Sequence, residues 1–133
     1  EWVLGLLDLK WAKVIFPKDK FLCETDVLAR LVTKDGKCVN ILASVGGAQP
    51  DRQEMTVRGT TKSRRISEFY KDIESKGMEF IPLREEPKDP RAVSLKAQLD
   101  DLEKAYNGHP NKLATVDEAL RVQVLIESIL ASK

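Results

Sequence analysis

The sequence has one histidine, His109, and two cysteines, Cys23 and Cys38, the residue types most used for nucleophilic catalysis and metal binding. His109 lies between Asn-Gly and Pro-Asn, which is typical of a loop, and no serine stands in a Gly-x-Ser-x-Gly context for it to activate. The three residues also lack the spacing of a zinc site. We therefore predict no catalytic residue and no metal ligand. We interpret His109 as a solvated loop residue and both thiols as reduced and partly buried, since two cysteines make no disulfide framework.

Phosphate-binding patterns are equally weak. Gly46-Gly47 and Gly59 do not open a helix in any known nucleotide-binding pattern. The basic run Lys62–Arg65 has the charge to hold a phosphate, but it lacks interleaved aromatic residues, and we interpret it as a solvated edge. The acidic residues in 100–103 are interpreted as a solvated helix face. We predict no cofactor-binding residue in this chain.

Charge and length limit the partners. The 22 basic and 21 acidic residues leave a formal net charge of +1, so no long-range field attracts nucleic acid or an anionic membrane. No apolar run approaches the roughly 20 residues that span a bilayer. The chain of 133 residues suits one domain, and it opens at Glu1 in the middle of an apolar pattern, as a piece of a longer protein would. We expect a single domain over residues 1–133 of a cytoplasmic protein, with no nucleic acid and no membrane as partner.

The stretch Thr25–Thr60 organises the fold, because it holds three runs in which apolar residues recur every second position. That period is typical of half-buried strands. A two-residue Asp35-Gly36 loop between the first two runs would place Leu31 opposite Asn40 and mix both faces. A three-residue loop with Gly36 left-handed keeps the apolar residues together. We predict this second register, with Leu31 opposite Val39, Ala29 opposite Ile41 and Val27 opposite Ala43.

The flanking segments complete the predicted elements. Residues 1–8 are expected to end a helix through Trp2, Val3 and Leu4 at Gly5. Lys10–Phe16 is a predicted strand with Trp11 and Lys13 on one side. Thr61–Phe69 should be extended with Ile66 and Phe69 inward, and Met78–Leu83 should be an edge strand, because Pro82 cannot donate to a ladder.

Two helices should follow the strands. Asp89-Pro90 is typical of a helix start, and a stripe of Leu95, Leu99, Leu102 and Tyr106 should face the core. Thr115–Glu118 matches a capping box for the last helix, which should end near Ala131. Since helices follow strands rather than alternate with them, we predict an α+β fold: an open, mostly antiparallel sheet with the helices packed on one face and the other face free for oligomerisation or substrate.

The two sheet faces should then have different partners. Leu120, Val122, Ile126 and Ile129 of the last helix are expected to be buried against Val27, Ala29, Leu31, Val39 and Ile41. The opposite face carries Leu28, Val32 and Leu42 among Arg30, Asn40 and Ser44. An apolar patch of that kind is typical of an interaction surface, so we expect a homo-oligomer through this face.

The order of several segments resembles one family. These are Val3-Leu4-Gly5, Glu24-Thr25-Asp26 before the Asp-Gly hairpin, Gln53–Thr60 (QEMTVRGT), Arg65-Ile66, Ala114–Leu120 (ATVDEAL) and Val124–Ser128. Together they resemble the C-terminal domain of the Gfo/Idh/MocA oxidoreductases over nearly the whole chain.

The resemblance implies a role within a larger enzyme. Family members transfer hydride between a nicotinamide cofactor and a sugar, polyol or related substrate. Their dinucleotide-binding Rossmann domain, Glu-Lys-Pro lysine and Asp/His catalytic motif would all precede Glu1, so no catalytic, cofactor-binding or metal residue carries over. This chain would be the domain that shapes the substrate pocket and subunit interface, inactive by itself, with NAD or NADP and a small-molecule substrate bound by the parent protein. The alternative is a domain of a non-catalytic ligand-sensing or regulatory protein of the same fold.

Overall fold

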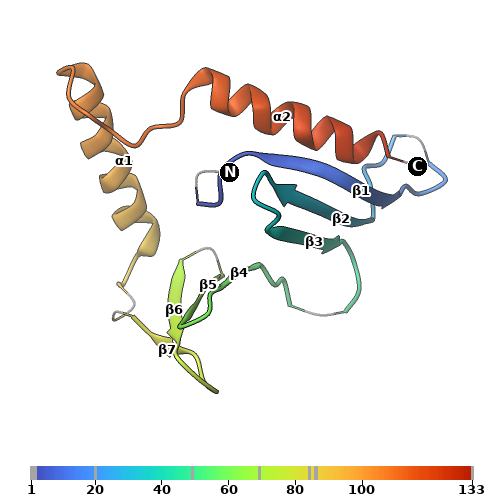
Figure 1. The fold of residues 1–133 in the computed structure, drawn as a ribbon, viewed down its shortest axis with the longest axis horizontal. Coiled ribbons are helices and arrows are strands. Elements are labelled where there is room, and N and C mark those ends of the chain that lie inside the picture. The colour runs from blue at the N-terminus through green and yellow to red at the C-terminus, as the bar shows by residue number, and fades with distance from the viewer. Residues whose placement is uncertain are drawn as a thin grey trace. The chain divides into compact units, whose positions relative to one another are not determined.

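The computed structural model describes residues 3–19, 21–48, 50–68, 70–83, 85 and 87–132. Its elements are β1 (Leu7–Ile15), β2 (Asp26–Thr33), β3 (Cys38–Ser44), β4 (Glu54–Arg58), β5 (Ser63–Ser67), β6 (Lys71–Ser75), β7 (Ile81–Pro82), α1 (Pro90–Tyr106) and α2 (Val116–Leu130) (Figure 1). The strands form two open antiparallel sheets, ordered β1-β2-β3 and β4-β5-β6-β7. The predicted α+β class with open antiparallel sheets is confirmed. Of the three alternating runs in Thr25–Thr60, the first two form β2 and β3, and the third forms β4 of the second sheet.

The chain folds as two compact units. The first contains Glu1–Gln49 and Ala114–Lys133, and therefore holds the first sheet and α2. The second contains Pro50–Leu113, with the second sheet and α1. Trp2 and Phe69, for which the sequence predicted a helix end and an inward position, lie outside the described residues.

The hairpin of β2 and β3 has the predicted register. Leu31 lies opposite Val39, and the pairs Ala29–Ile41 and Val27–Ala43 follow. The turn closes with the Thr33 amide donating to the Lys37 carbonyl at 2.9 Å, and Gly36 has a φ of +84°. A left-handed residue at this position favours glycine, because it has no Cβ to clash. The turn chemistry and the apolar pattern therefore select the same pairing.

Strand β1 begins earlier than predicted. Val3 and Leu4 lie in a turn and not in a helix, Gly5 has a φ of +86°, and the strand starts at Leu7. A β-bulge lies between Leu9, which is opposite Leu31, and Trp11, which is opposite Arg30. The extra residue reverses the alternation of side chains. Apolar residues on both sides of the bulge thus face the same core: Leu7 and Leu9 before it, Ala12 and Val14 after it.

The core of the first unit lies between its sheet and α2. Val14, Ala29, Leu31 and Ile129 are buried, with Val27, Val39, Ile41, Leu125 and Leu130 packed around them. Figure 1 shows α2 along β1, its main contact among the described elements. Because α2 lies on one strand, it buries a narrow stripe of side chains. The predicted burial of Leu120, Val122 and Ile126 is wrong, since all three are exposed, whereas that of Ile129 is confirmed.

The second unit contains a strand that the sequence did not reveal. Strand β6, with the sequence KDIES, pairs with β5 on one side and with the two-residue β7 on the other. Its charged composition concealed it. The predicted edge strand near Pro82 is confirmed as β7, and it is only two residues long.

Helix α1 has the predicted ends but not the predicted packing. The Asp89 carboxylate accepts from the Arg91 amide at 3.0 Å, Pro90 opens the helix, and Gly108 follows it with a φ of +70°. None of its described residues is buried, and the stripe of Leu95, Leu99, Leu102 and Tyr106 is exposed. Capping therefore determines where α1 lies in the sequence, while its apolar stripe has no cover in the second unit.

Candidate functional site

The candidate site is the face of the first sheet that α2 does not cover. We call it the open face. Strand alternation and the β1–β2–β3 register place on it Trp11, Lys13, Ile15, Leu28, Arg30, Val32, Asn40 and Leu42. Leu42 is 81% exposed, Trp11 45% and Leu28 44%. Large apolar side chains exposed on three neighbouring strands are typical of an interaction site.

A polar pair lies at the centre of the open face. The Arg30 side chain donates from Nε to Oδ1 of Asn40 at 2.9 Å, across the β2–β3 ladder. Trp11 lies opposite Arg30 on the other side of β2. The guanidinium keeps further donors that can reach across an interface. The face therefore combines apolar anchors with a held polar group, which is the composition of many protein interfaces.

Only part of this surface is predictable from the sequence. Leu28, Val32 and Leu42 share the face as expected, although Val32 is half-buried. Trp11 and Ile15 belong to it as well, but the sequence did not show that β1 pairs with β2. The alternation of side chains in β1 after Lys10 shows that Trp11 and Ile15 share one face of the strand. It identifies that face as part of the open face only once the pairing of β1 with β2 is known.

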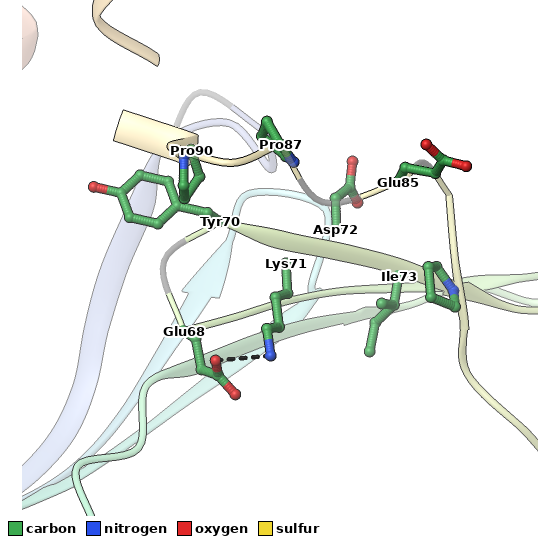
Figure 2. A pocket seen from close by; sticks show the side chains of 9 residues that line it. Glu68, Tyr70, Lys71, Asp72, Ile73, Glu85, Pro87 and Pro90 are labelled. Atoms are coloured by element: carbon green, nitrogen blue, oxygen red, sulfur yellow. Dashed lines mark ion pairs between the residues drawn. The ribbon is translucent and has the colours of Figure 1, made fainter. Parts of the chain in front are cut away.

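A small pocket lies in the second unit. It measures about 260 Å³ and is lined by nine residues: Glu68, Tyr70, Lys71, Asp72, Ile73, Pro82, Glu85, Pro87 and Pro90. Figure 2 shows Asp72 projecting from one side of β6 and Lys71 and Ile73 from the other. Asp72 accepts from Arg64 at 2.5 and 3.3 Å, and Lys71 pairs with Glu68 at 2.9 Å. Asp72, Lys71 and Glu68 are thus engaged in ion pairs, and Glu85 adds a further carboxylate to the lining.

The basic run Lys62–Arg65 does not lie at a sheet edge, because Ser63, Arg64 and Arg65 belong to β5, between β4 and β6. The predicted edge position is therefore wrong, whereas Lys62 and Arg64 are exposed to solvent as expected. Successive strand residues face opposite sides, and Arg64 and Arg65 accordingly have different partners. Arg64 binds Asp72, whereas Arg65 binds Glu54 at 3.2 Å and Thr56 at 2.9 Å and covers the Phe80 ring at 4.2 Å. Charge pairing across strands occupies these cations.

The remaining candidates are dispersed. His109 is exposed, and its amide closes α1 by donating to the Lys104 carbonyl at 2.8 Å. Cys23 and Cys38 are both exposed, so the predicted partial burial is wrong. Within the described ranges no three His, Cys, Asp or Glu residues group to hold a metal ion. In the same ranges, no helix has the length and apolar character needed to cross a membrane.

Glu74 is a charged side chain of the second unit whose pKa is changed by its neighbours. It is buried on β6 and accepts from Lys62 Nζ at 2.9 Å, with Lys76 Nζ at 4.0 Å. The Lys62 hydrogen bond is the main cause that lowers the Glu74 pKa below its ordinary 4.5. A pKa lowered by folding means that the ionised form favours the folded state. The interaction should therefore stabilise the second unit above pH 4.5 and fade as the pH falls through the lowered pKa.

Glu74→Gln tests this pH dependence. We expect the variant to be less stable than the parent chain at pH 7. The difference should shrink as the pH falls below 4.5 and through the lowered pKa, because Glu74 is then protonated first in the unfolded and next in the folded chain. Urea unfolding at pH 7 and at pH 3 measures the difference, and the exposed Glu79→Gln serves as control. An equal difference at both pH values would contradict an electrostatic role for Glu74.

Comparisons with protein-family models, with curated proteins and with solved structures found no match to this chain. The open face is thus the feature on which a function must be argued.

Proposed function

We propose that this chain is the assembly and substrate-side domain of an NAD(P)-dependent oxidoreductase that acts on a sugar, polyol or similar CH–OH substrate. The observation that supports the assembly role is the open face, on which Leu28 and Leu42 are exposed opposite each other and Trp11 is exposed on the third strand, opposite Arg30. The family and the redox role rest on the resemblance of segments such as QEMTVRGT and ATVDEAL. These two parts of the proposal are tested separately.

The assembly role follows from what the open face would gain. Two copies related by a two-fold axis present the same patch to each other, so one self-complementary surface serves both. Pairing removes the exposed apolar side chains from water, at roughly 25 cal/mol per Å² of apolar area. The Arg30 guanidinium, held by Asn40 at 2.9 Å, would bond across the seam.

Leu28→Asp should dissociate this contact. Leu28 lies on the central strand with Lys13 opposite it, so a carboxylate there is tolerated by the single chain but disfavoured in a dry interface. We expect sedimentation equilibrium to show an assembly of the parent chain and at least a twofold lower mass for the variant. The exposed loop residue Leu22 supplies the control, Leu22→Asp, which should leave the mass unchanged. Equal masses for the parent chain and Leu28→Asp would overturn the face-to-face model.

The redox role needs a different measurement. A polypeptide that joins this chain to a dinucleotide-binding domain should reduce NAD⁺ or NADP⁺ with members of a sugar and polyol panel. Tight sugar binding without turnover would instead favour a ligand-sensing protein. Neither result depends on the outcome of the Leu28 experiment.

A further inference from the structure

The edge strands of the two sheets differ in how they are protected. An exposed edge offers unpaired backbone groups to another strand, and proteins usually block it with charges, proline, bulges or short length. β1 has a bulge and carries Asp8, Lys10 and Lys13, β4 carries Glu54 and Arg58, and β7 is two residues long and contains Pro82. β3, with the sequence CVNILAS, has none of these features and pairs in regular register with β2.

The backbone groups of β3 that point away from β2 can be assigned. The bonds flanking the ladder are Thr33 N–H to the Lys37 carbonyl at 2.9 Å and Val45 N–H to the Thr25 carbonyl at 2.8 Å. Both join odd-numbered residues, and hydrogen-bonded pairs recur every second residue in an antiparallel ladder. The even-numbered residues of β3, from Cys38 to Ser44, therefore direct their N–H and C=O groups outward.

We propose that β3 pairs with β3 of a second copy of this chain, antiparallel about a two-fold axis at Ile41. This is an edge contact, separate from pairing through the open face. With that centre, Asn40 lies opposite Leu42 of the partner subunit and Cys38 opposite Ser44 of the partner subunit. In this register the outward N–H and C=O groups of one copy face those of the other, and every residue of Cys38–Ser44 has a residue opposite it. A two-fold axis at Asn40 or at Leu42 would also bring the outward groups of the even-numbered residues together, but it would leave one end of β3 without a partner.

The side chains on the core side of β3 favour a second copy as the occupant. α2 lies along β1, and Val39 and Ile41 remain only half-buried on the far side of the sheet. About the proposed axis Ile41 meets its own copy at a non-hydrogen-bonded position, where side chains approach most closely. Val39 then meets Ala43. The two incomplete cores would thus complete each other with apolar contacts.

The proposed pairing stops at two copies. It joins the β3 edges of both copies and leaves a β1 strand at each outer edge of the joined sheet. Since β1 is protected by its bulge and its charges, further strands are not added. A two-fold contact of this kind gives a dimer and not a fibre.

Disulfide trapping tests the register. The chain carries Leu28→Asp to remove open-face pairing, Cys23→Ser to remove the other thiol, and Ser44→Cys. Cys38 and the new thiol at position 44 would then lie in a hydrogen-bonded pair across the axis, with Cα atoms about 5.5 Å apart, which a disulfide can bridge. We expect mild oxidation to convert most of the chain into a disulfide-linked dimer on a non-reducing gel.

Ala43→Cys in place of Ser44→Cys is the matched control. Residue 43 faces the core side and Cys38 the open side, so this variant should remain monomeric on the gel. Equal cross-linking of both variants would indicate random collision and overturn the proposal. A dimer in solution that fails to cross-link through position 44 would overturn the proposed register.

Sedimentation supplies an independent readout. The Leu28→Asp chain should have twice the 15.0 kDa mass of one chain, and adding Leu42→Pro should return it to the single mass. Proline at position 42 removes an outward N–H without touching the β2–β3 ladder, whereas Leu42→Thr changes the side chain but keeps that N–H, and should stay dimeric. A monomeric Leu28→Asp chain would overturn edge pairing while leaving the open-face proposal intact.

Discussion

Leu31→Ala should lower the free energy of unfolding by about 2–5 kcal/mol, the usual cost of truncating a buried leucine. Leu31 is 2% exposed on the central strand of the first sheet, with Leu9 opposite it on β1 and Val39 opposite it on β3. Both neighbours are fixed by backbone pairing, so they cannot move to fill the space. The cost should therefore include both the lost transfer free energy and a cavity.

Urea unfolding followed by tryptophan fluorescence measures this effect, because both tryptophans belong to the chain segment of the first unit. The matched control is Leu22→Ala, since Leu22 is exposed in a loop, and the change there should stay within about 0.5 kcal/mol. A loss below about 1 kcal/mol for Leu31→Ala would show that the first sheet has no tightly packed core.

Ile129→Ala should have a comparable effect, again about 2–5 kcal/mol, because this side chain joins α2 to the sheet. Ile129 is 7% exposed within the core cluster, whereas Ile126, one turn earlier on the same helix, is 43% exposed. Ile126→Ala is therefore the matched comparison, and it should cost less than about 1 kcal/mol. The same fluorescence-detected unfolding compares the two variants.

This pair of substitutions discriminates between two arrangements of α2. If α2 covered the middle of the sheet, as the apolar stripe of the sequence predicts, Ile126→Ala would be the more damaging change. Equal losses at both positions would mean that the helix is buried over a wider surface than the contact with β1 provides.

The local parts of the fold were predictable because local chemistry determines them. The three-residue hairpin loop follows from Gly36 and the alternation of β2 and β3. The Thr115–Glu118 capping box was also predictable, and its bonds of 3.2 and 2.8 Å are present. In each case a few neighbouring residues contain the whole signal.

The remaining parts depend on partners that are distant in the sequence. Nothing local shows that β1 pairs with β2, that β4 belongs to a different sheet from β3, or that α2 contacts chiefly β1. The charged β6 strand could be found only through its pairing with β5. The candidate site was likewise predictable only in its local part. Leu28 and Leu42 lie on one hairpin and could be placed together, whereas Trp11 joins them through the β1–β2 pairing, which the sequence does not show.

The first unit is assembled from two ends of the chain, with residues 50–113 between them. The contacts of α2 with β1 therefore close a very long loop, while the β2–β3 hairpin closes a short one. The entropy of closure rises only with the logarithm of loop length, by about 0.6 kcal/mol per doubling, so the length of the inserted unit has little effect on equilibrium stability. Its effect is kinetic, since contacts between distant residues form more slowly than local ones. A nascent or refolding chain should thus present its first sheet with both faces bare until α2 docks, and this interval is when the β3 edge is most open to non-native pairing.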